Sequence, residues 1–175
     1  AKAYEITEEV VRQSIGPDIR LTEITKLALQ EAKKWTPCRI SSEGREAAYW
    51  DWSREVARFR KRPRRVEIAI WYGQTLLCGL ALGRTSKNRV VGTIHLLERA
   101  PLLEDHLSGV DLNGPLIIAP IAINFLEAYA RLLGCTEIAI DHPFDGLVPS
   151  YQRLGLDRKV TKGQKVLRLI RSLTD

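Results

Sequence analysis

Apolar residues recur every three to four positions between Pro120 and Gly134, which is the spacing of one face of a helix. More apolar residues on the flanks of this face predict a helix that is buried over most of its circumference. Pro120 suits the first helical position, and Gly134 suits the position just after the helix ends. The apolar run at 137–140 predicts a buried strand directly after it. The residues expected in the core are Ile121, Phe125, Leu132, Ile138 and Ile140.

Two amphipathic helices are predicted earlier in the chain. Apolar residues between Ile24 and Trp35 share one helical face, and charged residues fill the other. The second helix begins after a serine N-cap, at Ser41 or Ser42, and stops at Pro63 because proline cannot continue a helix. Large aromatic residues in this second helix are expected mainly in the core, with a substrate groove as the alternative.

Strand-like runs follow these helices. They lie at 66–72, 75–82, 89–97 and, near the end of the chain, 165–170. The short Gly73-Gln74 connection favours an antiparallel hairpin. Residues 3–15 fit either a strand or a short helix. The order of elements predicts an α/β fold class with a mixed, mostly antiparallel sheet flanked by helices.

Composition adds the expectation of one globular domain over residues 1–175. The chain is 45% hydrophobic and 27% charged, which is ordinary globular composition for 175 residues. No apolar run is long enough to cross a bilayer, and the first residues do not form a signal sequence, so we expect a cytoplasmic protein. The three cysteines have no partners at metal-ligand spacing, and we therefore expect reduced thiols and no metal site.

Basic residues are concentrated in one short stretch. The formal net charge is +6, and the run from Arg58 to Arg65 carries much of the excess. One interpretation is a solvated helix end, where basic residues complement the helix dipole before Pro63. The other is a surface that binds phosphate or carboxylate groups of RNA or of an acidic protein. In that case the binding residues are Arg58, Arg60, Lys61, Arg62, Arg64 and Arg65.

The C-terminal half of the sequence resembles a known superfamily. A long apolar helix ending in Leu133-Gly134, a strand, a short helix and then the run Tyr151-Gln-Arg-Leu-Gly-Leu156 resemble the C-terminal half of the GNAT N-acetyltransferases. The earlier helices and strands follow the element order of the same superfamily. The resemblance implies a GNAT-like fold and transfer of an acyl group from acetyl-CoA or another acyl-CoA to an amine.

The phosphate-binding loop of the superfamily is degenerate in this chain. Family members open the long helix with a Gly-rich motif whose backbone N–H groups hold the cofactor pyrophosphate. One alignment places this motif on residues 114–119, where only Ala119 matches; a second, on residues 111–116, keeps Gly114 but places Asp111 at the phosphate. The start of the helix remains available to an anion. The cofactor-binding residues implied are Leu97, Ala119, Pro120, Ile121, Ala122 and Ile123, with free N–H groups expected from Ile121 to Ile123.

The resemblance also implies catalytic roles. Tyr151 matches the tyrosine that commonly protonates the leaving CoA sulfur, although a packed tyrosine fits the pattern equally. Glu98 and His95, near the end of the third strand, are the candidates for handling the amine proton. A histidine on a strand is also commonly a hydrogen-bonded core residue, and His106 and His142 are alternatives in loops.

Two functions remain open at this point. The first is an acyl-CoA-dependent N-acyltransferase whose basic run lies on one rim of the substrate groove and selects an acidic or RNA-linked acceptor. The second is a non-catalytic GNAT-fold binding module whose basic face contacts nucleic acid or an acidic protein. The long connection at 98–116 is expected to be either a lid or partner-contact element at the cofactor cleft, or a passive surface loop.

Overall fold

The computed structural model describes residues 1–173 apart from 17, 37, 39–49, 102 and 109–116. Within them, the strands form one seven-stranded sheet in the order β1-β2-β3-β4-β5-β7-β6. Its strands are β1 (Ile19–Thr22), β2 (Arg65–Tyr72), β3 (Leu76–Thr85), β4 (Val91–Arg99), β5 (Glu137–Asp141), β6 (Arg158–Lys162) and β7 (Lys165–Ser172). Every neighbouring pair is antiparallel except β4 and β5, which are parallel.

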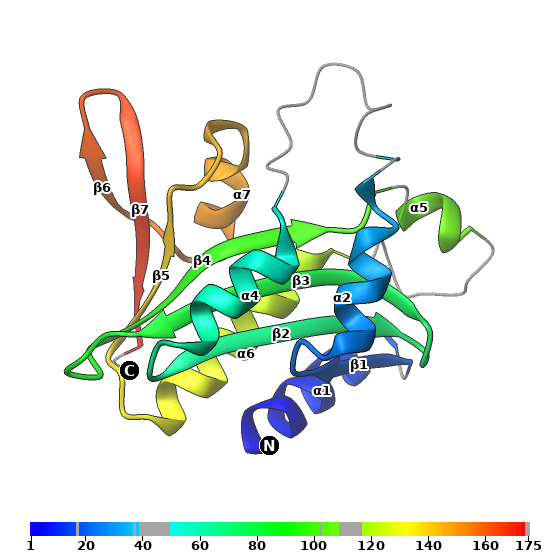
Figure 1. Ribbon diagram of the computed structural model, residues 1–175. Coiled ribbons are helices and arrows are strands. Elements are labelled where there is room, and N and C mark those ends of the chain that lie inside the picture. The colour runs from blue at the N-terminus through cyan, green and yellow to red at the C-terminus, as the bar shows by residue number, and fades with distance from the viewer. Residues whose placement is uncertain (17, 37, 39–49, 102, 109–116, 174–175) are drawn as a thin grey trace.

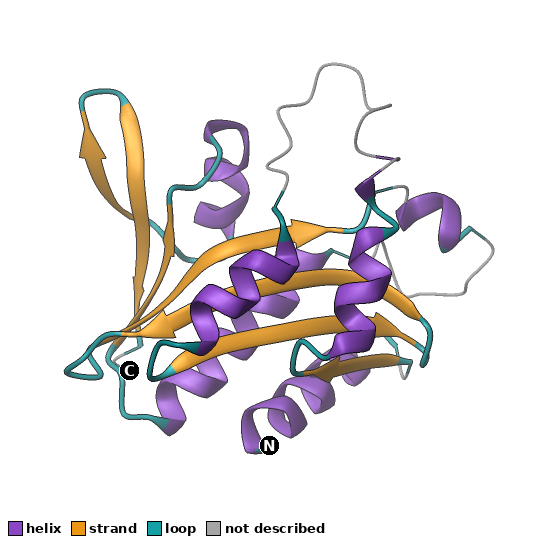
Figure 2. Ribbon diagram, viewed as in Figure 1, coloured by secondary structure: helices purple, strands orange, loops and turns teal. Residues whose placement is uncertain are grey.

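Helices cover both faces of this sheet (Figures 1 and 2). They are α1 (Lys2–Ser14), α2 (Lys26–Lys33), α4 (Trp52–Arg60), α5 (Leu103–His106), α6 (Ile118–Leu132) and α7 (Val148–Arg153), with the 3-10 turn η1 (Asp145–Leu147) before α7. Figure 2 shows α2 and α4 on one face and α1 and α6 on the other. The predicted mixed, mostly antiparallel sheet flanked by helices is confirmed.

The long apolar helix lies where its pattern places it, with two corrections. It begins at Ile118 rather than at Pro120, so that the proline lies within the first turn. Phe125 is 1% exposed and lies beside the ring of Tyr4 of α1, but Leu132 is 45% exposed and does not belong to the core. Leu132 is the last residue of α6.

The structure decides two local features that the sequence left open or gave inexactly: the conformation near the N-terminus and the length of the β2–β3 connection. Residues 3–15, which fit a strand or a helix, are helical, because α1 buries Ala3, Thr7 and Val11 against the sheet and α6. The hairpin between β2 and β3 has three connecting residues rather than two, since Tyr72 pairs with Leu76. Gly73 adopts φ +59°, a left-handed conformation that glycine tolerates without a steric penalty. No helix among the described residues is long and apolar enough to cross a membrane.

Candidate active site

The parallel strands β4 and β5 separate part-way along their length. They pair from Val91 with Glu137 to Ile94 with Ile140, and β4 then continues to Arg99 without β5 beside it. Next to the last paired position, Leu82 of β3 pairs with Leu96 and Gly83 pairs with Ile94, so His95 is an extra residue in a β-bulge. A bulge bends its strand. Figure 1 shows β4 and β5 running apart from this point, which leaves one edge of β4 open.

The open edge of β4 presents backbone hydrogen-bonding groups. Ala100 N–H donates to Cys78 O at 2.8 Å, so by the alternation of antiparallel strands Glu98 also faces β3. The N–H and C=O of Leu97 then point to the side from which β5 has turned away, and no strand among the described residues pairs with them there. A backbone N–H in this position can donate to a carbonyl oxygen and stabilise negative charge that develops on it.

His95 lies at the point of separation and contacts one charged residue of another strand, which an arginine holds in turn. Its Nδ1 is 2.9 Å from Asp141 Oδ2 at the end of β5. Arg168 of β7 holds the same carboxylate through Nε to Oδ1 at 2.5 Å and Nη2 to Oδ2 at 3.1 Å. Burial works to raise the pKa of Asp141, but the hydrogen bonds from His95 and Arg168 outweigh it and lower that pKa to about 2. The Asp141 carboxylate is therefore ionised at neutral pH.

Glu98 points to the same side of the sheet as His95 but has a different partner. Trp52, the first residue of α4, donates its indole N–H to Glu98 Oε2 at 2.6 Å, and Trp52 is 3% exposed. The His95 ring packs against Phe59 of the same helix with ring centroids 5.9 Å apart. The structure therefore brings the two predicted base candidates together under α4. The other histidines, His106 and His142, are exposed.

Tyr151 lies in α7 and is 6% exposed. Burial raises the pKa of Tyr151 to about 12, so its hydroxyl stays protonated at neutral pH. None of the described residues makes a hydrogen bond with this hydroxyl. A hydroxyl that is protonated and unpaired can donate a hydrogen bond, or a proton, to a departing sulfur atom.

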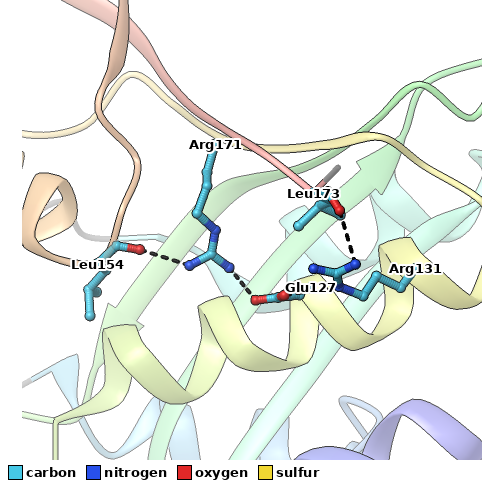
Figure 3. Close-up of polar contacts among 5 residues, drawn as sticks. All are labelled: Glu127, Arg131, Leu154, Arg171 and Leu173. Atoms are coloured by element: carbon cyan, nitrogen blue, oxygen red, sulfur yellow. Dashed lines mark hydrogen bonds and ion pairs between the residues drawn. The ribbon is translucent and has the colours of Figure 1, made fainter. Parts of the chain in front are cut away.

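A polar cluster fixes α7 to the rest of the molecule (Figure 3). Arg171 of β7 donates to the Leu154 carbonyl, the C-cap of α7, at 2.8 Å and pairs with Glu127 of α6. Arg131 of α6 also pairs with Glu127, at 3.0 Å, and donates to the Leu173 carbonyl at 3.0 Å. The cluster joins the helix that carries Tyr151 to α6 and β7. Sequence reasoning missed it, because Arg171 and Glu127 are 44 residues apart and are ordinary surface residue types.

The start of α6 requires a correction to the predicted phosphate donors. Because the helix begins at Ile118 after the N-cap Ile117, its unbonded N–H groups belong to Ile118 and Ala119, and not to Ile121–Ile123. The side chains of Ile121, Ala122 and Ile123 are at most 1% exposed and pack in the core. The first turn has no acidic residue and no side-chain cap. Ala119 and Pro120 stay candidate contacts, whereas residues 111–116 of the predicted loop lie outside the described residues.

A close approach to the sheet holds the start of α6 near the open edge. A Cβ added to Gly79 of β3 would lie 2.5 Å from Ile118 Cγ2. Gly79 pairs with Arg99, the last residue of β4. Glycine at this position therefore lets the unbonded N–H groups of α6 lie beside the open end of β4. The expected lid at 98–116 is described only in part, by the short helix α5.

The last residue of the basic run, Arg65, lies at the end of the sheet opposite the open edge of β4. Arg65 pairs with Arg84 of β3, and Arg84 pairs with Thr93, which precedes the point where β4 and β5 separate. Several guanidinium groups of the run have partners within the chain: Arg58 with Glu55 at 2.7 Å, Arg60 with the Ile24 carbonyl at 2.8 Å, and Arg65 with Glu67 at 3.2 Å. Arg58 and Arg62 also lie over the ring of Phe59, which packs against His95. The predicted place of the run on one rim of a substrate groove therefore stays a prediction.

Cavities in the described part of the chain include the following two. One, of about 410 Å³, lies between α2 and the start of α4 and is lined by Trp50, Asp51 and Trp52 among others. Through Trp52 it adjoins Glu98. The other, of about 450 Å³, lies between α1, α6 and the start of β2, and the separated end of β4 does not contribute to it. No residue of β4 lines either of these cavities, and the first approaches β4 only through Trp52.

Comparisons with solved structures give the following likenesses. An acetyltransferase from Thermus thermophilus is 20% identical with a TM-score of 0.58, covering 89% of this chain and 97% of that one. A GNAT-family acetyltransferase from Staphylococcus aureus is 9% identical with a TM-score of 0.60 (89% and 99%). An aminoglycoside 6'-N-acetyltransferase complexed with coenzyme A is 12% identical with a TM-score of 0.57 (89% and 97%). No protein-family model and no curated protein matches the sequence.

Proposed function

We propose that this chain, which has the fold of the GNAT acetyltransferases, transfers an acyl group from an acyl-CoA to an amine. The observation that carries the proposal is the separation of β4 from β5 after Ile94. It leaves the Leu97 N–H on an open edge, with the α6 N-terminus at the end of that edge. Two candidate bases lie on β4, and a protonated tyrosine lies on α7.

The residues present fit an acyl-CoA. An extended chain of amide groups can pair with the open edge of β4 as a further strand would. The N–H groups of Ile118 and Ala119 point out of the start of α6, where a phosphate is favoured by the helix dipole. When bound, the acyl-CoA supplies a thioester, whose carbonyl carbon accepts a nucleophile and whose sulfur is the leaving group.

Each protein group then has one task in the transfer. Leu97 N–H donates to the thioester carbonyl oxygen and stabilises the negative charge that develops there. Glu98 or His95 takes a proton from the acceptor ammonium group, which frees the nitrogen lone pair for attack. Tyr151 gives its hydroxyl proton to the departing sulfur. The cavity beside Trp52 is where we place the acceptor.

A titration with acetyl-CoA tests this proposal. We expect binding tighter than about 1 mM, which corresponds to roughly 4 kcal/mol, in calorimetry and as an increase in melting temperature. Tyr151→Phe should retain that binding and reduce kcat by about 10²-fold or more, the usual contribution of a general acid. Tyr72→Phe is the matched control, since Tyr72 lies at the β2–β3 turn and its hydroxyl bonds to Asp18. Absence of binding at millimolar acetyl-CoA would refute the proposal.

The rival function is a binding module that uses the basic run on an acidic partner. It is favoured by the loss of the family's glycines at 114–119, and the exposed Arg62 and Lys61 beyond α4 are the residues that carry it. Neutralising several phosphates together makes affinity fall steeply with salt. A rival of this kind binds RNA or an acidic peptide with a steep salt dependence and shows no acetyl-CoA binding in the same titration.

A further inference from the structure

We propose that Asp141 and Arg168 are positioning residues that make His95, rather than Glu98, the base for the acceptor amine. This inference rests on the proposed acyl transfer and adds to it a choice of base and two residues that no sequence motif indicates. It stands on the contacts at the point where β4 and β5 separate: Nδ1 of His95 to Asp141, and Asp141 to Arg168.

The Asp141 carboxylate fixes which ring nitrogen of His95 carries the proton. A carboxylate only accepts hydrogen bonds, and Asp141 Oδ2 is 2.9 Å from Nδ1, so the neutral imidazole carries its proton on Nδ1. The lone pair then lies on Nε2. This is the arrangement in which a carboxylate orients a histidine as a general base and stabilises the imidazolium that forms.

Nε2 of His95 has no hydrogen-bond partner among the described residues and is enclosed. A buried nitrogen without a partner has lost its hydrogen bonds to water and gained none in the fold, so a bound donor that pairs with it is favoured. The side chain as a whole is 21% exposed, so His95 is not sealed inside the core. The acceptor nitrogen, directly or through one water molecule, supplies the missing donor to Nε2.

Arg168 keeps the negative charge of Asp141 from holding His95 in its protonated, imidazolium form. Its two nitrogens contact both oxygens of Asp141, so the carboxylate is held in one orientation and its charge is partly balanced. Without Arg168 the full charge of Asp141 would act on His95 and favour the imidazolium, which cannot accept a proton. Among the described residues, further charged groups on the elements next to the ring include Glu98 on β4 and, over the Phe59 ring of α4, Arg58 and Arg62.

Glu98 is less suited to the same task. One of its carboxylate oxygens accepts the Trp52 indole N–H at 2.6 Å, so that oxygen is already engaged. Trp52 is almost fully buried, so this bond is fixed by the packing of α4. We assign Glu98 the role of holding the start of α4, and with it the acceptor cavity, in place.

The proton and electron balance closes with these groups. The acceptor ammonium loses one proton to Nε2, and its nitrogen forms a bond to the thioester carbonyl carbon. The carbon–sulfur bond breaks, and the thiolate takes the Tyr151 hydroxyl proton to give free CoA thiol. As the amide forms, its nitrogen loses a second proton to solvent. Solvent returns one proton to the tyrosinate, and the imidazolium releases its own proton to solvent. The net products are an amide, the thiol and one proton.

The pH dependence of kcat/KM for the acceptor tests the assignment, because the two positioning residues act in opposite directions. In Asp141→Asn the imidazolium loses its counter-charge, so the acidic limb of the profile shifts to lower pH and kcat falls by about 10²-fold or more. In Arg168→Gln the carboxylate charge is no longer balanced, so the acidic limb shifts to higher pH. KM for acyl-CoA should be unchanged in both. Asp145→Asn, at an exposed residue after β5, is the matched control.

The tautomer of His95 is measured separately by long-range proton–nitrogen NMR of the full chain, which contains three histidines. We expect an Nδ1-protonated neutral ring in the parent and in Arg168→Gln, and loss of that preference in Asp141→Asn. This readout does not need turnover, so a parent without acyl transfer refutes the proposed function while the tautomer still reports on the contacts. Three results would each overturn the inference. They are a shift of the acidic limb in the same direction in both variants, a fall in kcat in Asp141→Asn no larger than in the control, and a parent protein whose His95 is protonated on Nε2.

Discussion

Replacement of Gly83 by alanine should destabilise the protein more than the same change at Gly79, the other glycine of β3. Gly83 pairs with Ile94 beside the bulge that displaces β4 from β5. An added Cβ would lie 2.0 Å from the Thr93 carbonyl oxygen and 2.9 Å from the Thr93 carbonyl carbon. Both atoms belong to the backbone, so relief requires that two paired strands move apart.

The size of the effect follows from that distance. Ordinary contacts of a Cβ begin at 3.4 Å, and the contact at Gly83 is about 1.4 Å short of it. Forcing one carbon into a packed site costs about 1–3 kcal/mol and more where backbone must shift, so we expect a loss of about 3 kcal/mol in the free energy of unfolding. Gly79→Ala should cost less, because the Cβ meets mainly the side chain of Ile118, which can change its rotamer.

Gly146→Ala is the matched control. Nothing lies within 4 Å of a Cβ at that position, so the change should leave stability within about 1 kcal/mol of the parent. Denaturant unfolding followed by tryptophan fluorescence measures all three variants, since the chain has four tryptophans. The expected order of stability is Gly146→Ala, then Gly79→Ala, then Gly83→Ala. A Gly83→Ala variant as stable as Gly146→Ala would refute the close contact and the bulge geometry derived from it.

Three further predictions concern charged residues. Arg171→Gln should remove the contacts of the guanidinium with Leu154 and Glu127, which lowers the free energy of unfolding by about 1–2 kcal/mol and increases hydrogen exchange in α7. Hydrogen exchange equal to that of the parent would show that the cluster does not hold this helix. The triple replacement of Arg60, Arg62 and Arg64 by Gln should flatten the salt dependence of any RNA binding; it should also cost about 1 kcal/mol of stability, because Arg60 donates to the Ile24 carbonyl. Unchanged binding at low salt would identify the run as a solvated surface. The lowered pKa of Asp141 stabilises the fold by about 2 kcal/mol above pH ~4, and this contribution is lost as the pH falls towards about 2. The difference in unfolding free energy between the parent and Asp141→Asn should therefore narrow over that pH range.

The helix α6 and the strands were determined largely by the sequence. A helical spacing of apolar residues buries a side chain such as Phe125 in any fold that places a sheet beside it, and alternating or continuous apolar runs do the same for strands. The order of these elements was enough to predict a mixed sheet flanked by helices. Boundaries were less certain: α6 begins at Ile118, two residues before the proline, and Ile118 packs closely on Gly79 of β3, a contact between residues far apart in the sequence.

The candidate site was determined by tertiary structure. Tyr151, His95 and Glu98 were identified from their places along the chain, but their partners come from other elements. Arg168 and Asp141 are 27 residues apart, and the bulge that sets His95 opposite them depends on a register shift between β3 and β4. Residue spacing in a sequence reports which side chains share one helix face or one strand face. Which strand neighbours which, and where two strands part, is decided only when the whole sheet packs against its helices.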